Sequence, residues 1–447
     1  MNLKSIPGSI VAPRGFRASG VFCDIKRLGT GKGSEKGKKR DLALIVSEVP
    51  ATVAGMFTTN QVCAAPVKVC LERVKRGVAQ ALVVNSGNAN ACTGAQGLKD
   101  AKAMVRFAGR TLGLPDGSVL VGSTGRIGVP LPMDNVHAGI VATAAELGST
   151  PDHAAHAAEA IMTSDTRLKQ IAVEFKLSGK TVRLGGICKG AGMIQPGMSR
   201  DGKRPAATPP HATMLCFLTT DAAIEAPWLQ TTLEEAVAQS FNRITVDGDM
   251  STNDTVLILA NGLAGNPLIK WDSADDTDAI REDLLTFEEA LDHVSLELAK
   301  MIVCDGEGVS RFVSVIVEGA RTFDDADAAA RAVANSALVK TSWCGGDPNW
   351  GRIIDALGYS AAKVVENKVD IGYSAPGSCE VLWSLKRGQP TRVSFKRLCA
   401  AVARKEFDLH INLNLGGAEA IIYAADLTEA YVDFNKGDVS DPSSLGG

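Results

Sequence analysis

Apolar and polar positions follow two alternating patterns along the chain. Short runs rich in Val, Ile and Leu, as in residues 42–58 and 79–89, predict strands with turns between them. Apolar residues spaced three and four apart, as in residues 98–113, predict amphipathic helices. The repeated exchange of these patterns predicts an α/β (α+β) fold, a layered sandwich of β-sheets covered by helices. Further helices are predicted at residues 152–162, 286–302 and 324–337.

The second half of the chain adds three strand-like regions. Residues 244–262 predict two strands joined by a tight polar turn, because two apolar runs flank a polar segment. Residues 392–398 and 409–428 alternate between apolar and polar positions, which is typical of half-buried strands.

Composition excludes several classes of protein. The chain has 447 residues, 45% of them hydrophobic, and a net charge of −3, so neither nucleic acid nor an anionic membrane is an expected partner. No apolar run approaches the ~20 residues that span a bilayer, and the start of the chain lacks a secretory apolar segment. The ten cysteines include no CxxC pair and the six histidines are scattered, so we expect a cytoplasmic protein without a metal site.

Two segments are predicted to be exposed loops. Residues 27–40 are rich in Gly and Lys but lack the spacing of a phosphate-binding loop, so they predict a solvated hairpin tip. Residues 197–210 are polar and rich in Pro, and they lie directly before an apolar run.

That apolar run, residues 214–218, predicts a buried strand, and Thr213 stands immediately before it. Cleavage of the bond between Ala212 and Thr213 would free an α-amine with a pKa of about 7.7–8, within reach of the Thr213 hydroxyl. A threonine with such a base can act as a nucleophile in acyl transfer. The alternative is a threonine at a strand edge whose hydroxyl is simply hydrogen-bonded.

Three further segments carry candidate chemistry. Thr124 and Gly125 follow an apolar strand in "GSTG", where backbone N–H groups and a hydroxyl could stabilise an oxyanion, or could form an ordinary turn. Lys189 lies in a Gly-rich turn suited to a carboxylate, or to solvent. Asp305 and Glu307 follow a predicted helix and either bind a substrate amine or cap a turn.

In combination these segments resemble the ornithine acetyltransferase (glutamate N-acetyltransferase) family of arginine biosynthesis. The resemblance extends over nearly the whole chain, and its motifs occur in the family's order. They are "PATVAGMFTTN" (50–60), "VVNSGNANACTG" (83–94), "GSTGRIG" (122–128), "MTSDT" (162–166), "KGAGMIQP" (189–196), "ATMLCFLTTDA" (212–222), "FNRITVDGDMSTNDT" (241–255), "DGEG" (305–308) and "DPNWGRI" (347–353).

The resemblance implies an N-terminal-nucleophile fold and self-cleavage between Ala212 and Thr213. An α chain (1–212) and a β chain (213–447) would stay associated, in a heterotetramer of two α and two β chains. Thr213 would be the nucleophile, with Thr124 and Gly125 as the oxyanion hole. The positions that match the family's substrate-binding residues are Thr163, Lys189, Thr213, Glu307, Asn435 and Ser440.

The implied reaction is acetyl transfer by a ping-pong mechanism. Thr213 would take the acetyl group of N-acetylornithine and release ornithine, and the amine of glutamate would then take it to give N-acetylglutamate. Lys189 would bind the α-carboxylate that both substrates carry, and Glu307 would bind the ornithine amine. No metal or organic cofactor is implied.

The sequence departs from the family pattern at residues 197–210. In the family, the segment that begins at Lys189 runs almost directly into the cleavage motif, whereas here the loop intervenes and His211 replaces an apolar residue. A second Ala-Thr pair at 207–208 lies in this loop, but a proline follows it and no apolar strand anchors it.

Three other functions stay open from the sequence. The enzyme could also acetylate glutamate with acetyl-CoA, it could be an N-terminal-nucleophile amidohydrolase or aminopeptidase that uses water as acceptor, or it could be a non-catalytic binding or scaffold protein. An assay with N-acetylornithine and glutamate separates them, because a hydrolase needs no glutamate and a scaffold shows no turnover.

Overall fold

The computed structural model of the protein describes residues 3–26, 39–203, 214–270 and 278–436. The strands are β1 (Lys4–Ser5), β2 (Phe16–Val21), β3 (Leu42–Thr58), β4 (Val78–Asn88), β5 (Val119–Arg126), β6 (Lys169–Leu177), β7 (Lys180–Lys189), β8 (Met198–Ser199), β9 (Leu215–Thr220), β10 (Ile244–Thr245), β11 (Thr255–Ala260), β12 (Phe312–Ala320), β13 (Asp370–Ser374), β14 (Leu382–Lys386), β15 (Gln389–Pro390), β16 (Glu406–Asn412) and β17 (Ala418–Ala425).

Helices follow most of the strands. They are α2 (Ala65–Val74), α3 (Gly94–Leu112), α4 (Met133–Ala145), α5 (Pro151–Ile161), α6 (Ala226–Gln239), α7 (Asp278–Cys304), α8 (Phe323–Asn335), α9 (Ala337–Cys344), α10 (Trp350–Gly358), α11 (Phe395–Val402) and α12 (Glu429–Phe434), with short 3₁₀ turns η1 (Ser9–Val11), η3 (Phe241–Arg243) and η4 (Glu366–Lys368).

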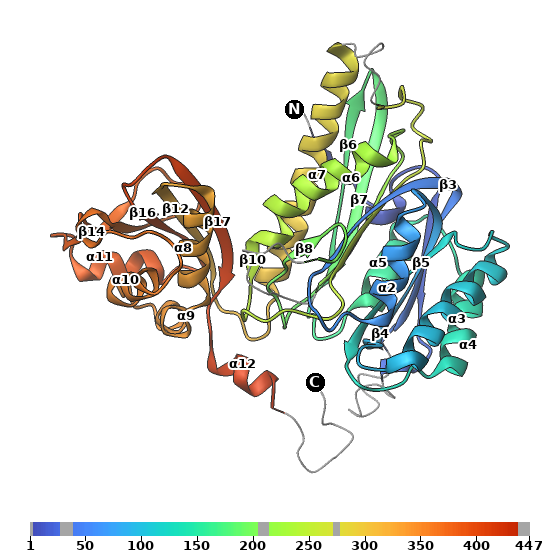
Figure 1. Ribbon diagram of the computed structural model, residues 1–447, viewed down its shortest axis with the longest axis horizontal. Helices are drawn as coiled ribbons and strands as arrows, with labels where there is room; N and C mark the ends of the chain where they lie inside the picture. The colour runs from blue at the N-terminus through green and yellow to red at the C-terminus, as the bar shows by residue number, and fades with distance from the viewer. Residues whose placement is uncertain (1–2, 27–38, 204–213, 271–277, 437–447) are drawn as a thin grey trace.

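Strands in the described ranges form two sheets, which lie in two lobes side by side (Figure 1). The larger sheet has ten strands in the order β1-β6-β7-β9-β11-β3-β4-β5, with β2 and β8 also paired to β3. The smaller sheet has seven strands in the order β10-β17-β12-β16-β13-β14-β15. Helices cover these sheets, so the predicted α/β fold with layered, helix-covered sheets is confirmed.

Strand β9 lies inside the larger sheet and is buried on both faces. Leu215 and Phe217 pack with the core under α2–α5, whereas Cys216 and Leu218 pack with the core under α6 and α7. Side chains alternate across a strand, so a strand covered on both faces needs apolar residues at successive positions. The predicted buried strand at residues 214–218 is thus confirmed, with Met214 as the buried residue before it.

Segments from both predicted chains build the larger sheet. β9 and β11 come from residues 213–447, and they lie between β7 and β3, which come from residues 1–212. β9 pairs antiparallel with β7 and parallel with β11. A break before β9 would therefore leave its ladder hydrogen bonds on both sides in place.

The smaller lobe has two layers. Its sheet packs one face against α8–α11, and the core between them contains Val315, Phe407 and the buried Trp343. β10 joins the lobes, because it follows α6 of the larger lobe yet pairs in parallel with β17 of the smaller sheet. The ion pair of Arg243 with Asp327, at 2.8 Å, also connects the two lobes.

Three local expectations were wrong or incomplete. Residues 244–262 do contain two strands, but these join different sheets and are not a hairpin. Residues 392–398 do not form a strand; Phe395–Val402 is helix α11, in which Leu398, Ala401 and Val402 face the core while Phe395 is exposed. The loop at 197–210 begins with strand β8, which pairs with Thr58 and Phe57 of β3.

We predict that Phe217→Ala lowers the free energy of unfolding by about 3–5 kcal/mol, because it opens a cavity in the sheet core. Phe217 is 1% exposed. Urea unfolding measures the change, and Phe395→Ala, at a position 67% exposed, is the control, with an expected change within about 0.5 kcal/mol. Equal effects of the two substitutions would contradict this packing.

Candidate active site

The turn at Thr124 and Gly125 ends strand β5 and is held against strand β4. Gly125 has φ +128°, and a Cβ there would lie 2.4 Å from the carbonyl carbon of Gly87. Only glycine fits such a close approach at this backbone angle. Asn253 donates from Nδ2 to the carbonyl oxygens of Ser123 (2.8 Å) and Ala89 (2.7 Å), which fixes the turn from the β11 side.

Lys189 is buried at the end of β7 and reaches this turn. Its Nζ donates to Thr124 Oγ1 at 3.3 Å. Burial lowers the pKa of Lys189 from its ordinary value, and the carboxylates of Asp165 and Glu307 act in the opposite direction. The structure thus brings together Thr124 and Lys189, which are 65 residues apart in the chain.

Lys189 also lies beside the start of β9. It pairs with Leu215 in the β7–β9 ladder, and Leu215 pairs with Thr255 in the β9–β11 ladder. These three residues therefore form one row across three neighbouring strands. Thr213 and Ala212 lie outside the described residues, but Thr213 is joined covalently to Met214, the residue directly before this row.

Asp254 lies directly before strand β11, and its Oδ1 accepts a hydrogen bond from the backbone N–H of Met214. Burial raises the pKa of Asp254 well above its ordinary value, against the opposing effects of this hydrogen bond and of Lys189. Sequence reasoning missed Asp254, because it lies in a polar segment that predicts a turn.

A buried network of ion pairs and hydrogen bonds lies next to Lys189. Lys169 Nζ contacts Asp165 Oδ1 at 2.6 Å and Asp305 Oδ2 at 2.5 Å. Asp165 also accepts from the N–H of Gly190 (2.7 Å) and from the N–H of Thr163 (2.9 Å). Asp165 therefore connects the predicted substrate-binding position Thr163 to the turn after Lys189.

The charges in this network shift the pKa values of Asp165 and Lys169. Burial alone would raise the pKa of Asp165, but Lys189, Lys169 and the N–H of Gly190 outweigh it and hold that pKa below its usual range. Burial alone would lower the pKa of Lys169, but Asp165 and Asp305 raise it. Sequence reasoning missed Asp165 and Lys169; Asp165 stands within the "MTSDT" segment, which was the available signal.

Glu307 and Asn435 meet at the end of helix α12. Asn435 donates from Nδ2 to Glu307 Oε2 at 2.9 Å. The N–H of Glu307 donates to the carbonyl of Ala191 at 2.8 Å, which places Glu307 beside the turn that follows Lys189. Of the predicted positions, Ser440 lies outside the described residues.

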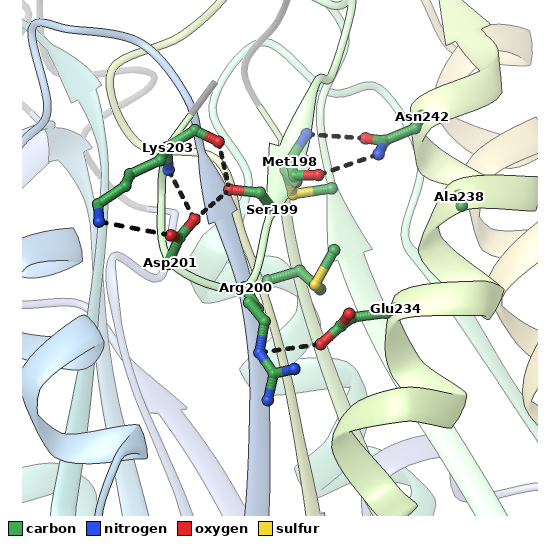
Figure 2. Close-up of a pocket in the computed structure, with 9 residues that line it drawn as sticks. Met198, Ser199, Arg200, Asp201, Lys203, Glu234, Ala238 and Asn242 are labelled. Atoms are coloured by element: carbon green, nitrogen blue, oxygen red, sulfur yellow. Dashed lines mark hydrogen bonds and ion pairs between the residues drawn. The ribbon is translucent and has the colours of Figure 1, made fainter. Parts of the chain in front are cut away.

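A hollow elsewhere in the described residues is lined by none of the predicted site residues. It has a volume of about 530 Å³ and lies between residues 198–203 and helix α6. Figure 2 shows that its polar groups pair with each other: Arg200 with Glu234 at 3.1 Å, and Met198 N–H with Asn242 Oδ1 at 2.9 Å. The described start of this segment, residues 198–203, therefore contacts α6 and the residue Asn242 that follows it.

Comparison with known proteins assigns the sequence to a family. The profile of the ArgJ family matches residues 18–437. The chain belongs to the ArgJ family. The predicted resemblance to ornithine acetyltransferases, a family of acyltransferases, is thereby confirmed.

Two relatives illustrate how far the ArgJ family likeness extends. The arginine biosynthesis bifunctional protein ArgJ of Symbiobacterium thermophilum is 46% identical over 96% of this chain and 98% of its own length. The glutamate N-acetyltransferase of Methanocaldococcus jannaschii is 41% identical over 97% of this chain and 99% of its own length.

Two solved structures match part of the chain. A chain of the arginine biosynthesis bifunctional protein ArgJ of Bacillus halodurans is 42% identical, with a TM-score of 0.41, over 44% of this chain and 98% of its own length. A chain of ornithine acetyltransferase complexed with ornithine, from Mycobacterium tuberculosis, is 36% identical, with a TM-score of 0.40, over 44% of this chain and 100% of its own length.

No helix within the described ranges is long and apolar enough to span a bilayer.

We predict that Asp165→Asn destabilises the protein by about 3–5 kcal/mol at pH 7, because it leaves buried Lys169 and Lys189 without that carboxylate. The folded pKa of Asp165 is lowered, so its ionised form stabilises the fold above the unfolded pKa of about 3.9. That contribution is lost as the pH falls through the folded pKa.

Urea unfolding between pH 7 and pH 3 measures this difference. We expect the gap between wild type and Asp165→Asn to be constant near neutral pH and to shrink below about pH 4. Exposed Asp116→Asn is the control, with a change within about 0.5 kcal/mol. A gap that stays constant down to pH 3 would contradict the assignment.

Proposed function

We propose that the protein transfers an acetyl group from N-acetylornithine to glutamate through an acetyl ester on Thr213. The observation that carries the proposal is the row formed by Lys189, Leu215 and Thr255, which sets a buried lysine beside the start of β9. The Nζ of this lysine also contacts Thr124, the predicted oxyanion-hole residue. Membership of the ArgJ family supports the same reaction class.

In this mechanism the chain first cleaves itself between Ala212 and Thr213. The freed α-amine of Thr213 acts as base, and the hydroxyl attacks the acetyl carbonyl. The hydroxyl of Thr124 and the N–H of Gly125 stabilise the negative charge on the carbonyl oxygen. Ornithine leaves with the proton, and the amine of glutamate then attacks the ester.

The buried positive charge of Lys189 suits the α-carboxylate that donor and acceptor share. Glu307, with Asn435 at 2.9 Å, suits the side-chain amine of the donor. Thr163, held by Asp165, and Ser440 complete the proposed set. We further propose that the α chain (1–212) and β chain (213–447) stay joined through the larger sheet, and that two of each form a heterotetramer in the cytoplasm.

A second activity is acetylation of glutamate with acetyl-CoA. The word bifunctional in the name of the 46% identical relative favours it.

The assay that tests both functions supplies glutamate with N-acetylornithine, glutamate with acetyl-CoA, or N-acetylornithine alone. Turnover with N-acetylornithine but not with acetyl-CoA indicates acetyl transfer from N-acetylornithine alone. Turnover with each of these two donors indicates both activities. Ornithine release at full rate without glutamate would replace the proposal with a hydrolase.

We predict that Thr124→Ala lowers kcat for acetyl transfer about 10²–10³-fold, because one oxyanion donor is lost. KM should change much less, and Thr124→Ser should recover most of the rate. Steady-state kinetics measures both constants. The control is Thr111→Ala at an exposed position, where the hydroxyl donates to the carbonyl of Phe107 in its own helix. A kcat for Thr124→Ala equal to that of the control would exclude the oxyanion role.

We predict that Glu307→Gln raises KM for N-acetylornithine about tenfold, because the neutral amide accepts a weaker hydrogen bond from the substrate ammonium than the carboxylate does (~1.5 kcal/mol). KM for glutamate should stay unchanged, since glutamate carries no side-chain amine. Varying one substrate at saturating levels of the other gives both constants. An unchanged KM for N-acetylornithine would rule out this contact.

A further inference from the structure

One buried carboxyl oxygen beside the start of β9 has no partner. Asp254 is 0% exposed, and its Oδ1 accepts from the N–H of Met214. Its Oδ2 is fully buried and has no hydrogen-bond partner among the described residues. A buried polar atom without a partner costs about 1–3 kcal/mol, so such atoms are rare in folded proteins.

The surrounding side chains are committed to other contacts. Asn253 points its amide at Ala89 and Ser123, and the hydroxyl of Thr255 donates to the carbonyl of Asn253 at 2.9 Å. Within the described residues, Lys189 is the charged group whose electrostatic interaction shifts the pKa of Asp254. Its positive charge lowers that pKa, but burial raises it by more. Burial thus disfavours the charged carboxylate of Asp254, and a second cation beside it would favour that form.

A second cation would come from chain cleavage. The bond broken before Thr213 frees an α-amine three covalent bonds from the Met214 nitrogen that Asp254 already contacts. The two carboxyl oxygens of Asp254 could then hold the Met214 N–H and this amine together. Burial of Asp254 excludes water from competing for the amine.

We propose that Asp254 is the positioning residue of the acetyl-transfer site, whose Oδ2 accepts a hydrogen bond from the α-amine of Thr213 after cleavage. This inference rests on the proposed function. In the first half-reaction the Thr213 hydroxyl proton moves to the amine, and the new Oγ1–C bond forms. The acetyl C–N bond then breaks, and the proton passes from the ammonium to the departing ornithine amine. Asp254 orients the amine and stabilises its protonated form, as the third member of a catalytic triad does.

The first test compares wild type with Asp254→Asn and Asp254→Glu, with rates expressed per cleaved chain as counted by intact mass. Asp254→Asn keeps an acceptor for Met214 N–H but removes the negative charge. We expect kcat to fall at least about tenfold while KM changes less than about threefold. We also expect Asp254→Glu to recover part of the rate.

The pH profile separates positioning from a merely structural role. A carboxylate neighbour raises the pKa of an amine, so the acidic limb of kcat should move to lower pH in Asp254→Asn. Asp221→Asn is the matched control, because Asp221 is also buried and follows the same strand β9, but both its oxygens have partners. Its kcat and pH profile should equal those of wild type. A wild-type profile and kcat in cleaved Asp254→Asn would overturn the inference.

Cleavage itself could fail in Asp254→Asn, and a second measurement then decides. NMR titration of protein labelled with ¹³C at the Asp carboxyls compares cleaved wild type with uncleaved Thr213→Ala, and Asp254→Asn assigns the signal. We expect a lower pKa for Asp254 in cleaved wild type, because the ammonium lies beside it, and an equal pKa would overturn the inference. Wild type that neither cleaves nor transfers acetyl would instead sink the proposed function.

Discussion

The burial of β9 between strands of both predicted chains is the constraint on which the rest of the structure depends. Its ladders with β7 and β11 fix one row, Lys189, Leu215 and Thr255, and thereby set the buried lysine and Asp254 on either side of the strand's start. The same ladders join strands from both predicted chains in one sheet. A cut before β9 would consequently expose a new terminus inside a framework that does not need the peptide bond to hold together.

The buried ions of the Lys169 network each have partners that offset the cost of removing them from water. Lys169 lies between Asp165 and Asp305, and Asp165 also accepts from Thr163 and Gly190, so each ion that is removed from water has nearby partners. Removing ions from water is expensive, and such networks hold together only when geometry is good. Asp254 differs, because one of its oxygens has no such partner among the described residues. The contrast between these two carboxyls is what singles Asp254 out.

Sequence patterns predicted the parts of the fold in which local periodicity and burial agree. The apolar run before and through β9 and the helical spacing of α3 and α8 appear close to the expected positions. The pairing of β10 and β11 with different sheets was not predictable, because it depends on partners far away in the chain. Helix α11 was mistaken for a strand because Val393 and Phe395 alternate with polar residues, although Phe395 is exposed. Thr124 and Lys189 were singled out within their motifs, whereas Asp165 and Asp254 also lie in quoted motifs but stand out only through contacts with residues distant in the chain.

Intact mass under denaturing conditions, for wild type and Thr213→Ala, tests the central claim most directly. The account predicts two wild-type fragments that join at Ala212 and Thr213, and a single uncut chain for the variant. A cut at residues 207–208 would move the nucleophile into the preceding loop. A single wild-type chain of 46.8 kDa would contradict the account, because no free α-amine would then stand at the start of β9.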